Sequence, residues 1–272
     1  MHYGGKEYQF PTEIGPTHFK TKNLKIKVSI FENRIEKIDM NCKYVFADIE
    51  TNGLSMTNLK LLQIAAITED DEQFNIFINP KTELSLSCTN LCGLYYFQGQ
   101  LYRNGKLIPS SGVYTAVNRF RNWLEGLGKE IILVFHNGFS FDCYVLAKQF
   151  LGLKIKVPVN VKKVCDTLPA FRKHLKGPEI ANHKLSTLAT HFDIECPRAH
   201  DALEDSIVLK AICERAVLSL NLDLETLLSA HLREFQYYVD KEILRTEARA
   251  VKTLLPSKDE NAERHGGENL DL

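Results

Sequence analysis

The chain has 272 residues, of which 44% are hydrophobic and 25% charged, and its 34 basic side chains balance its 34 acidic ones. This composition is typical of a globular protein, and zero net charge disfavours a protein that coats duplex nucleic acid through many phosphate contacts. No apolar run approaches the ~20 residues that cross a bilayer, and Met1 begins no signal peptide, so we expect an intracellular protein without a membrane partner, in nucleus or cytoplasm.

Residues 1–40 are predicted to form an N-terminal extension. Residues 1–23 show no periodicity and are expected to be irregular. From Leu24 to Ile30 apolar residues alternate with polar ones, which predicts a half-buried strand. A turn at residues 32–34 would pair this strand with a second one, so we expect a β-hairpin.

Residues 41–220 are predicted to form the main domain. Strands are expected at four apolar segments, residues 44–47, 61–68, 74–78 and 131–135. Helices are expected at residues 113–127, 142–150, 166–174 and 185–192, and a long one from Asp201 onward. Because several β segments precede the order helix, strand, helices, we predict an α/β fold with a mixed β-sheet flanked by α-helices.

Residues 221–255 are predicted to form a C-terminal helical extension, because leucines and Phe235 recur at helical spacing between residues 222 and 254. This helix is a candidate surface for a protein partner or for self-association. Residues 256–272 are polar and contain glycine, which predicts a disordered tail.

Asp48 and Glu50 end an apolar strand, and strand ends are where α/β proteins bind ligands. Residues two apart in a strand point to the same face, so the two carboxylates project together. They repel each other unless a cation lies between them, and Mg²⁺ and Mn²⁺ take oxygen ligands. Taken alone, the pair is more simply explained by a strand that has reached solvent.

The segment from His136 to Asp142 follows a second apolar strand and opens a helix. Asp142 falls in the first helical turn, where the helix dipole favours a carboxylate, and that alone would explain it. Residues 138–142 partly match the G-x-S-x-G nucleophile elbow, but the final glycine is missing, which disfavours a serine hydrolase.

The segment from His200 to Asp205 joins a loop to a helix. Asp201 and Glu204 have the spacing of a capping box, which places His200 just outside the helix and Asp205 within it. A carboxylate fixed on a helix suits a metal ligand, and a histidine on a loop suits a base that approaches water. Taken alone, His200 would be a loop histidine in solvent.

Together the three segments resemble the DEDDh family of 3′–5′ exonucleases, which have an RNase H-like fold. The resemblance is carried by residues 44–54, by His136, Asn137, Phe141 and Asp142, and by residues 200–205. Residues 63–66 and 166–168 support it. The likeness runs from about residue 42 to residue 218, inside the main domain, and leaves both extensions outside.

The resemblance implies a metal-dependent 3′–5′ exonuclease that releases nucleoside 5′-monophosphates. Four carboxylates would hold two Mg²⁺ or Mn²⁺ ions, and these are Asp48, Glu50, Asp142 and Asp205. His200 would be the general base that acts on the attacking water.

The resemblance also implies a nucleic-acid partner, bound at its 3′ end and preferably single-stranded. Thr51, Gly53 and Leu54 would line the terminal nucleotide, and Asn137 and Phe141 would contact the strand. The lysine-rich stretch of residues 154–176 is either a border of the phosphate path or a solvated face.

Two alternatives stay open. The chain could be a catalytically idle module that binds nucleic acid or protein on the same fold, although such a module has no need for converging carboxylates. It could also be an endonuclease or another phosphodiester hydrolase. DNA and RNA are not distinguished, because that choice rests on contacts to the 2′-hydroxyl.

Overall fold

The computed structural model describes residues 42–254. The expected N-terminal extension with its hairpin and the expected disordered tail lie outside the described residues. The domain boundaries at residues 41, 220 and 255 stay predictions.

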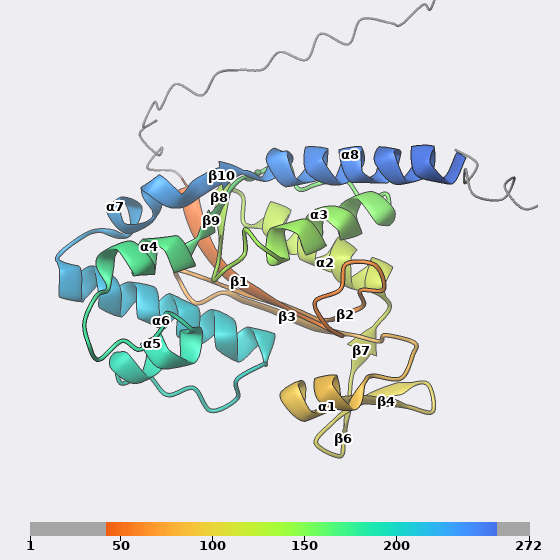
Figure 1. Ribbon diagram of the computed structural model, residues 1–272, viewed down its shortest axis with the longest axis horizontal. Coiled ribbons are helices and arrows are strands. Elements are labelled where there is room, and N and C mark those ends of the chain that lie inside the picture. Colours follow the sequence, from red (N-terminus) through yellow and green to blue (C-terminus); the bar gives the residue numbers. More distant parts are fainter. Residues whose placement is uncertain (1–41, 255–272) are drawn as a thin grey trace, which may run out of the picture. The chain divides into compact units, whose positions relative to one another are not determined.

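The described residues are organised around a seven-stranded mixed sheet with the strand order β10-β9-β8-β1-β2-β3-β7 (Figure 1). The strands are β1 (Cys42–Thr51), β2 (Leu61–Thr68), β3 (Gln73–Ile78), β7 (Ser110–Ser111), β8 (Glu130–Phe135), β9 (Val161–Asp166) and β10 (Leu232–Glu234). Strands β1, β8 and β9 run parallel, whereas β2 pairs antiparallel with both β1 and β3. The predicted mixed sheet is therefore confirmed.

Helices cover both faces of the sheet (Figure 1). One face carries α2 (Val113–Gly126), α3 (Asp142–Gly152) and α8 (Phe235–Leu254), and the other carries α4 (Thr167–His174), α5 (Leu185–His191), α6 (Ala202–Leu220) and α7 (Leu224–Leu228). In β1, Val45 and Ala47 pack into the first core, while Tyr44 and Phe46 pack into the second. This alternation explains why the strand is a continuous apolar run, since both of its faces are buried.

A small second sheet was not predicted. It follows α1 (Leu86–Cys92) and contains β4 (Leu94–Phe97), β5 (Gln100–Arg103) and β6 (Lys106–Ile108) in antiparallel order. Its own core is formed by Leu62, Cys88, Cys92, Leu94 and Leu101. We call this unit the inserted sheet, because it lies in the chain between β3 and β7 of the main sheet.

The predicted continuous helix over residues 222–254 is interrupted. After α7 and a 3₁₀ turn at Ser229–His231, β10 pairs antiparallel with β9, and only then does α8 begin at Phe235. The edge of β9 supplies hydrogen bonds for β10, and this tertiary pairing overrides the helical pattern.

Among the described residues, no helix combines the length and apolar character that a membrane-spanning segment requires.

Candidate active site

The C-terminal ends of three parallel strands meet at one edge of the sheet. Phe46 of β1 pairs with Val134 of β8, and Phe135 pairs with Asp166 of β9. Asp48 and Glu50 lie just beyond Phe46, next to an irregularity of the β1–β2 ladder between Glu50 and Thr51. Both carboxylates are half-buried. The structure thus places them at the strand end where ligands bind in such sheets.

Asp142 comes to the same edge from the loop after β8. It is the first residue of α3, and its side chain is buried. The loop is held by the Asp166 carboxylate, which accepts from the backbone N–H of Asn137 at 2.8 Å and of Phe139 at 3.1 Å. Asp166 therefore positions the segment that carries Asp142. This gives a structural role to residues 166–168, which supported the resemblance in the sequence.

The third segment approaches from α6. The side chain of Asp201 caps this helix by accepting from the backbone N–H of Leu203 at 3.1 Å, as predicted. The Asp205 carboxylate accepts from the backbone N–H of His200 at 3.0 Å. The His200 side chain is 45% exposed, and its Nδ1 lies 3.9 Å from Oε1 of Glu50. A partly exposed imidazole therefore lies at the rim of the site beside the carboxylate of Glu50.

The carboxylates interact as one electrostatic cluster. Burial raises the pKa of Asp48 well above its usual range, and the charges of Asp142, Glu50 and Asp205 raise it further. Burial likewise raises the pKa of Glu50 to about 8, of Asp142 to about 7 and of Asp205 to about 6. Such a cluster favours the uptake of protons or cations at neutral pH, because four wholly or partly buried negative charges repel one another.

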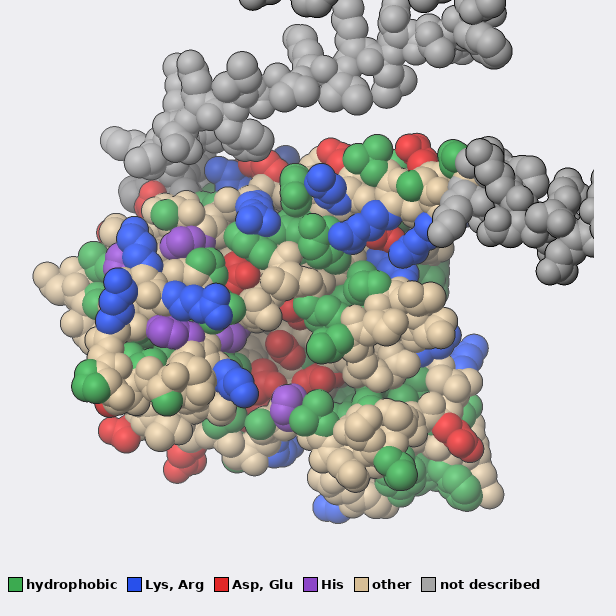
Figure 2. Space-filling model, viewed as in Figure 1, with side chains coloured by type: hydrophobic (Ala, Val, Ile, Leu, Met, Phe, Trp, Pro, Cys, Tyr) green, Lys and Arg blue, Asp and Glu red, His purple; other side chains and the backbone are tan. Residues whose placement is uncertain are grey.

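The five predicted catalytic residues are related by short distances and by electrostatic interaction. Ligand atoms of Glu50, His200 and Asp205 lie within 4.8 Å of one another, the one such group of metal-binding side chains among residues 42–254. Asp48 and Asp142 are joined to this group through the electrostatic cluster rather than through that short spacing. In Figure 2, acidic side chains gather in a hollow near the centre of the drawn face, with a histidine at its edge.

Sequence reasoning missed two residues that hold the His200 loop. Arg103 of the inserted sheet forms an ion pair with Asp201, and its Nη2 donates to the backbone carbonyl of His200 at 3.3 Å. Gln63 of β2 donates from Nε2 to Asp201 at 2.9 Å and accepts from the backbone N–H of Ala202 at 3.1 Å. Gln63 stood in a supporting motif, whereas nothing in the sequence around Arg103 pointed to the site.

The predicted substrate-contacting residues lie on two loops. Thr51 Oγ1 donates to the carbonyl of Gly53 at 2.8 Å, and Gly53 has φ +147°, a conformation that favours glycine. Leu54 is 81% exposed, so an apolar side chain stands in solvent beside the carboxylates. On the other loop Asn137 is exposed and Phe141 is half-buried.

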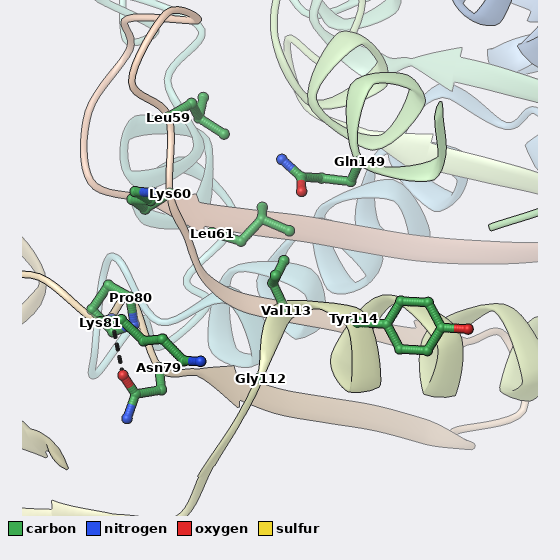
Figure 3. A pocket seen from close by; sticks show the side chains of 10 residues that line it. All are labelled: Leu59, Lys60, Leu61, Asn79, Pro80, Lys81, Gly112, Val113, Tyr114 and Gln149. Atoms are coloured by element: carbon green, nitrogen blue, oxygen red, sulfur yellow. Dashed lines mark hydrogen bonds between the residues drawn. The ribbon is translucent and has the colours of Figure 1, made fainter. Parts of the chain in front are cut away.

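A second hollow lies at the start of β2 and α2. It has a volume of about 370 Å³ and is lined by Leu59, Lys60, Leu61, Asn79, Pro80, Lys81, Gly112, Val113, Tyr114 and Gln149 (Figure 3). None of the predicted catalytic residues lines it, and its lining contains no carboxylate or histidine. It therefore lacks the carboxylate and histidine donors that meet at the candidate active site.

Comparison with known proteins adds independent findings. A family model described as an exonuclease, RNase_T, matches residues 45–213. The PolC-type DNA polymerase III of Bacillus subtilis (strain 168) is 33% identical over 171 residues, which are 60% of this chain and 10% of that protein. That of Streptococcus pyogenes serotype M1 is 29% identical over 244 residues, 80% of this chain and 16% of that protein. The matched part of the chain thus spans only a small fraction of the length of these relatives.

Solved structures share the fold. A zinc-bound complex of E. coli exonuclease I with single-stranded DNA superimposes with a TM-score of 0.53 at 17% identity, over 79% of this chain and 45% of that one. A complex of E. coli exonuclease I with an oligonucleotide gives a TM-score of 0.51 at 18% identity, over 66% and 41%. The likeness supports the predicted RNase H-like architecture.

Proposed function

The chain belongs to the RNase_T exonuclease family, and from this premise we propose that it hydrolyses phosphodiester bonds from the 3′ end of a single strand and releases nucleoside 5′-monophosphates. The observation that carries the proposal is the meeting of Asp48, Glu50, Asp142 and Asp205 in one electrostatic cluster with His200 at its rim.

The donor set fits divalent cations. All four carboxylates offer oxygen atoms, which are the ligands of Mg²⁺ and Mn²⁺, and their raised pKa values signal negative charge that lacks compensation. Two such ions would supply positive charge for the attacking and leaving oxygens of the displacement. The four carboxylates would hold them, with Asp205 oriented by the His200 amide and Asp142 carried by the segment that Asp166 anchors.

His200 is proposed as the general base. Its ring is exposed on the rim and can reach a water molecule, while its backbone is anchored by Asp205 and Arg103. The ring would take the proton of the attacking water, and the carboxylates would stay in place.

The strand end is proposed to lie against the Thr51–Leu54 loop. Gly53 lets a nucleotide approach the backbone closely, and the exposed Leu54 offers an apolar surface for the terminal base. Asn137 and Phe141 would contact the same strand from the α3 side. A strand so placed has its last phosphate at the carboxylates.

The direct test uses 5′-labelled single strands of DNA and RNA with Mg²⁺, with Mn²⁺ and with EDTA. We expect a ladder of shortening products that needs metal and is abolished by Asp48→Asn, because the variant lacks one ligand charge. Lys129→Gln, a change in an exposed residue before β8, serves as the control. Metal-dependent cutting of a circular strand would indicate an endonuclease, and intact linear strands under both metals would contradict the proposal.

A further inference from the structure

The helix α8 lies outside the residues matched by the exonuclease family and carries a stripe of cationic and aromatic side chains. Within the helix, Tyr237, Lys241 and Arg245 lie at intervals of four residues, a spacing that keeps helical side chains on one face. Arg233 precedes them on β10 and is brought to this face by its contact with the Tyr237 ring. All four residues are exposed. We call them the α8 stripe.

The α8 stripe is stacked on aromatic rings that belong to the neighbourhood of Asp142. The Arg233 guanidinium lies 4.1 Å from the ring centroid of Phe139, and that of Arg245 lies 4.2 Å from the ring centroid of Tyr144. Phe139 and Tyr144 flank Asp142 in the chain, on the loop and helix that deliver this carboxylate. The stripe thus packs on the loop and helix that carry Asp142.

Within the stripe, a ring and a cation lie together on the surface. The Tyr237 side chain is 41% exposed, the Lys241 ammonium lies 5.5 Å from its ring centroid, and the Arg233 guanidinium lies 5.9 Å from it. Surfaces that bind single strands combine cations for the phosphates with aromatic rings for the bases. The stripe has both components, with one ring among three cations.

The acidic side chains near α8 offset the positive charge of the stripe only in part. Glu242 is buried and forms an ion pair with Arg245 at 3.6 Å. Asp240 and Glu247 are exposed, but at about 100° per residue both point about 100° or more away from the centre of the stripe. Figure 2 shows Lys and Arg side chains over α8 on the same face as the hollow that holds acidic side chains.

We propose that the α8 stripe binds the part of a single-stranded nucleic acid that lies upstream of its 3′ end. The direction of the strand rests on the proposed function, whereas the binding itself does not. A track of this kind gives a protein with zero net charge a local hold on phosphates, which the acidic cluster alone would repel.

Fluorescence anisotropy of the full chain in EDTA tests the binding without cleavage. We expect single strands of about 16 nucleotides to bind more tightly than strands of about 4 nucleotides, because only the longer ones reach α8. Tyr237→Ala should weaken binding of the long strand roughly fivefold to tenfold, whereas Tyr237→Phe, which keeps the ring, should restore it. Thermal unfolding of each variant checks that the fold is kept.

The salt dependence of the affinity distinguishes a direct contact between Lys241 and a phosphate from a change in the overall charge of the protein. Lys241→Gln should reduce the slope of log affinity against log salt by about 0.7, the value for one lost phosphate contact with a single strand. Lys129→Gln removes the same charge at the opposite end of β8 and should leave the slope unchanged.

The outcomes distinguish this proposal from the proposed function. Length-dependent binding that is lost in the Tyr237 and Lys241 variants supports the α8 stripe even if no cleavage occurs. Metal-dependent cleavage together with unchanged long-strand affinity in both variants would overturn it. Self-association that is lost in Tyr237→Ala, with strand binding intact, would also overturn it and assign the face to a second copy of the chain.

Discussion

His200, the proposed general base, has an anchored backbone and a partly exposed ring. Its ring faces Glu50, its backbone N–H is held by Asp205, and its backbone carbonyl is held by Arg103. The backbone is therefore anchored, while the ring is partly exposed at the rim. Such a residue suits a base, although its spacing to Glu50 and Asp205 is also short enough for a shared ion.

Replacing His200 with alanine should lower kcat by about 10²–10⁴ and leave Mn²⁺ binding intact, because general base catalysis contributes a factor of this size. Single-turnover cleavage and calorimetric Mn²⁺ titration measure the two quantities separately. Asp205→Asn is the matched comparison and should weaken Mn²⁺ binding. Loss of Mn²⁺ binding in His200→Ala would move this histidine into the ligand set.

At the scale of elements, the inserted sheet acts on the active site through one side chain. Arg103 reaches from β5 to Asp201 at the start of α6, and both side chains are nearly buried, at 12% and 6% exposure. Gln63 of β2 holds the same carboxylate from the main sheet. Two sheets and a helix thus fix the loop of the proposed base.

Arg103→Lys should therefore lower kcat more than it changes KM. The lysine keeps a positive charge for the buried Asp201, but it cannot also supply the second N–H that reaches the His200 carbonyl. Arg121→Lys, which alters a surface pair with Glu125 in α2, should change neither constant. Equal effects of the two substitutions, or an effect of Arg103→Lys on thermal stability alone, would show that Arg103 has no positioning role.

The elements also show what the sequence could predict. The paired carboxylates on β1, the cap at Asp201 and the opening of α3 at Asp142 follow from local patterns, and the structure has all three. The link from Arg103 to Asp201 spans 98 positions and leaves no local pattern. Strand β10 has three residues between helical segments, too short for an alternating pattern to appear.

On the scale of the whole molecule, the acidic cluster opposes folding when no cation is present. The pKa values of Glu50, Asp142 and Asp205 are raised to about 8, 7 and 6, above the ordinary values near 4 of an unfolded chain. The folded state therefore binds more protons than the unfolded state between these limits. The contribution of the cluster to stability is present at low pH and is lost as pH rises through about 6 to 8.

In EDTA, the Tm of the wild type relative to that of Asp48→Asn should fall as pH rises from about 5 to about 8, because the variant carries less repulsion. Mg²⁺ or Mn²⁺ should raise the wild-type Tm more at pH 8 than at pH 5. Scanning fluorimetry of both proteins across this range measures the difference between their Tm values. Groups elsewhere titrate equally in both proteins, so their effect cancels in that difference. A wild-type Tm that rises relative to the variant over the same interval would contradict this account.

The central claim is that four carboxylates from β1, α3 and α6 form one cage for paired cations. An anomalous difference map from crystals soaked in Mn²⁺ tests it most directly. We predict two peaks about 3.5–4 Å apart, in contact with Asp48, Glu50, Asp142 and Asp205. Peaks on separate surfaces, or no peak shared by these side chains, would contradict it.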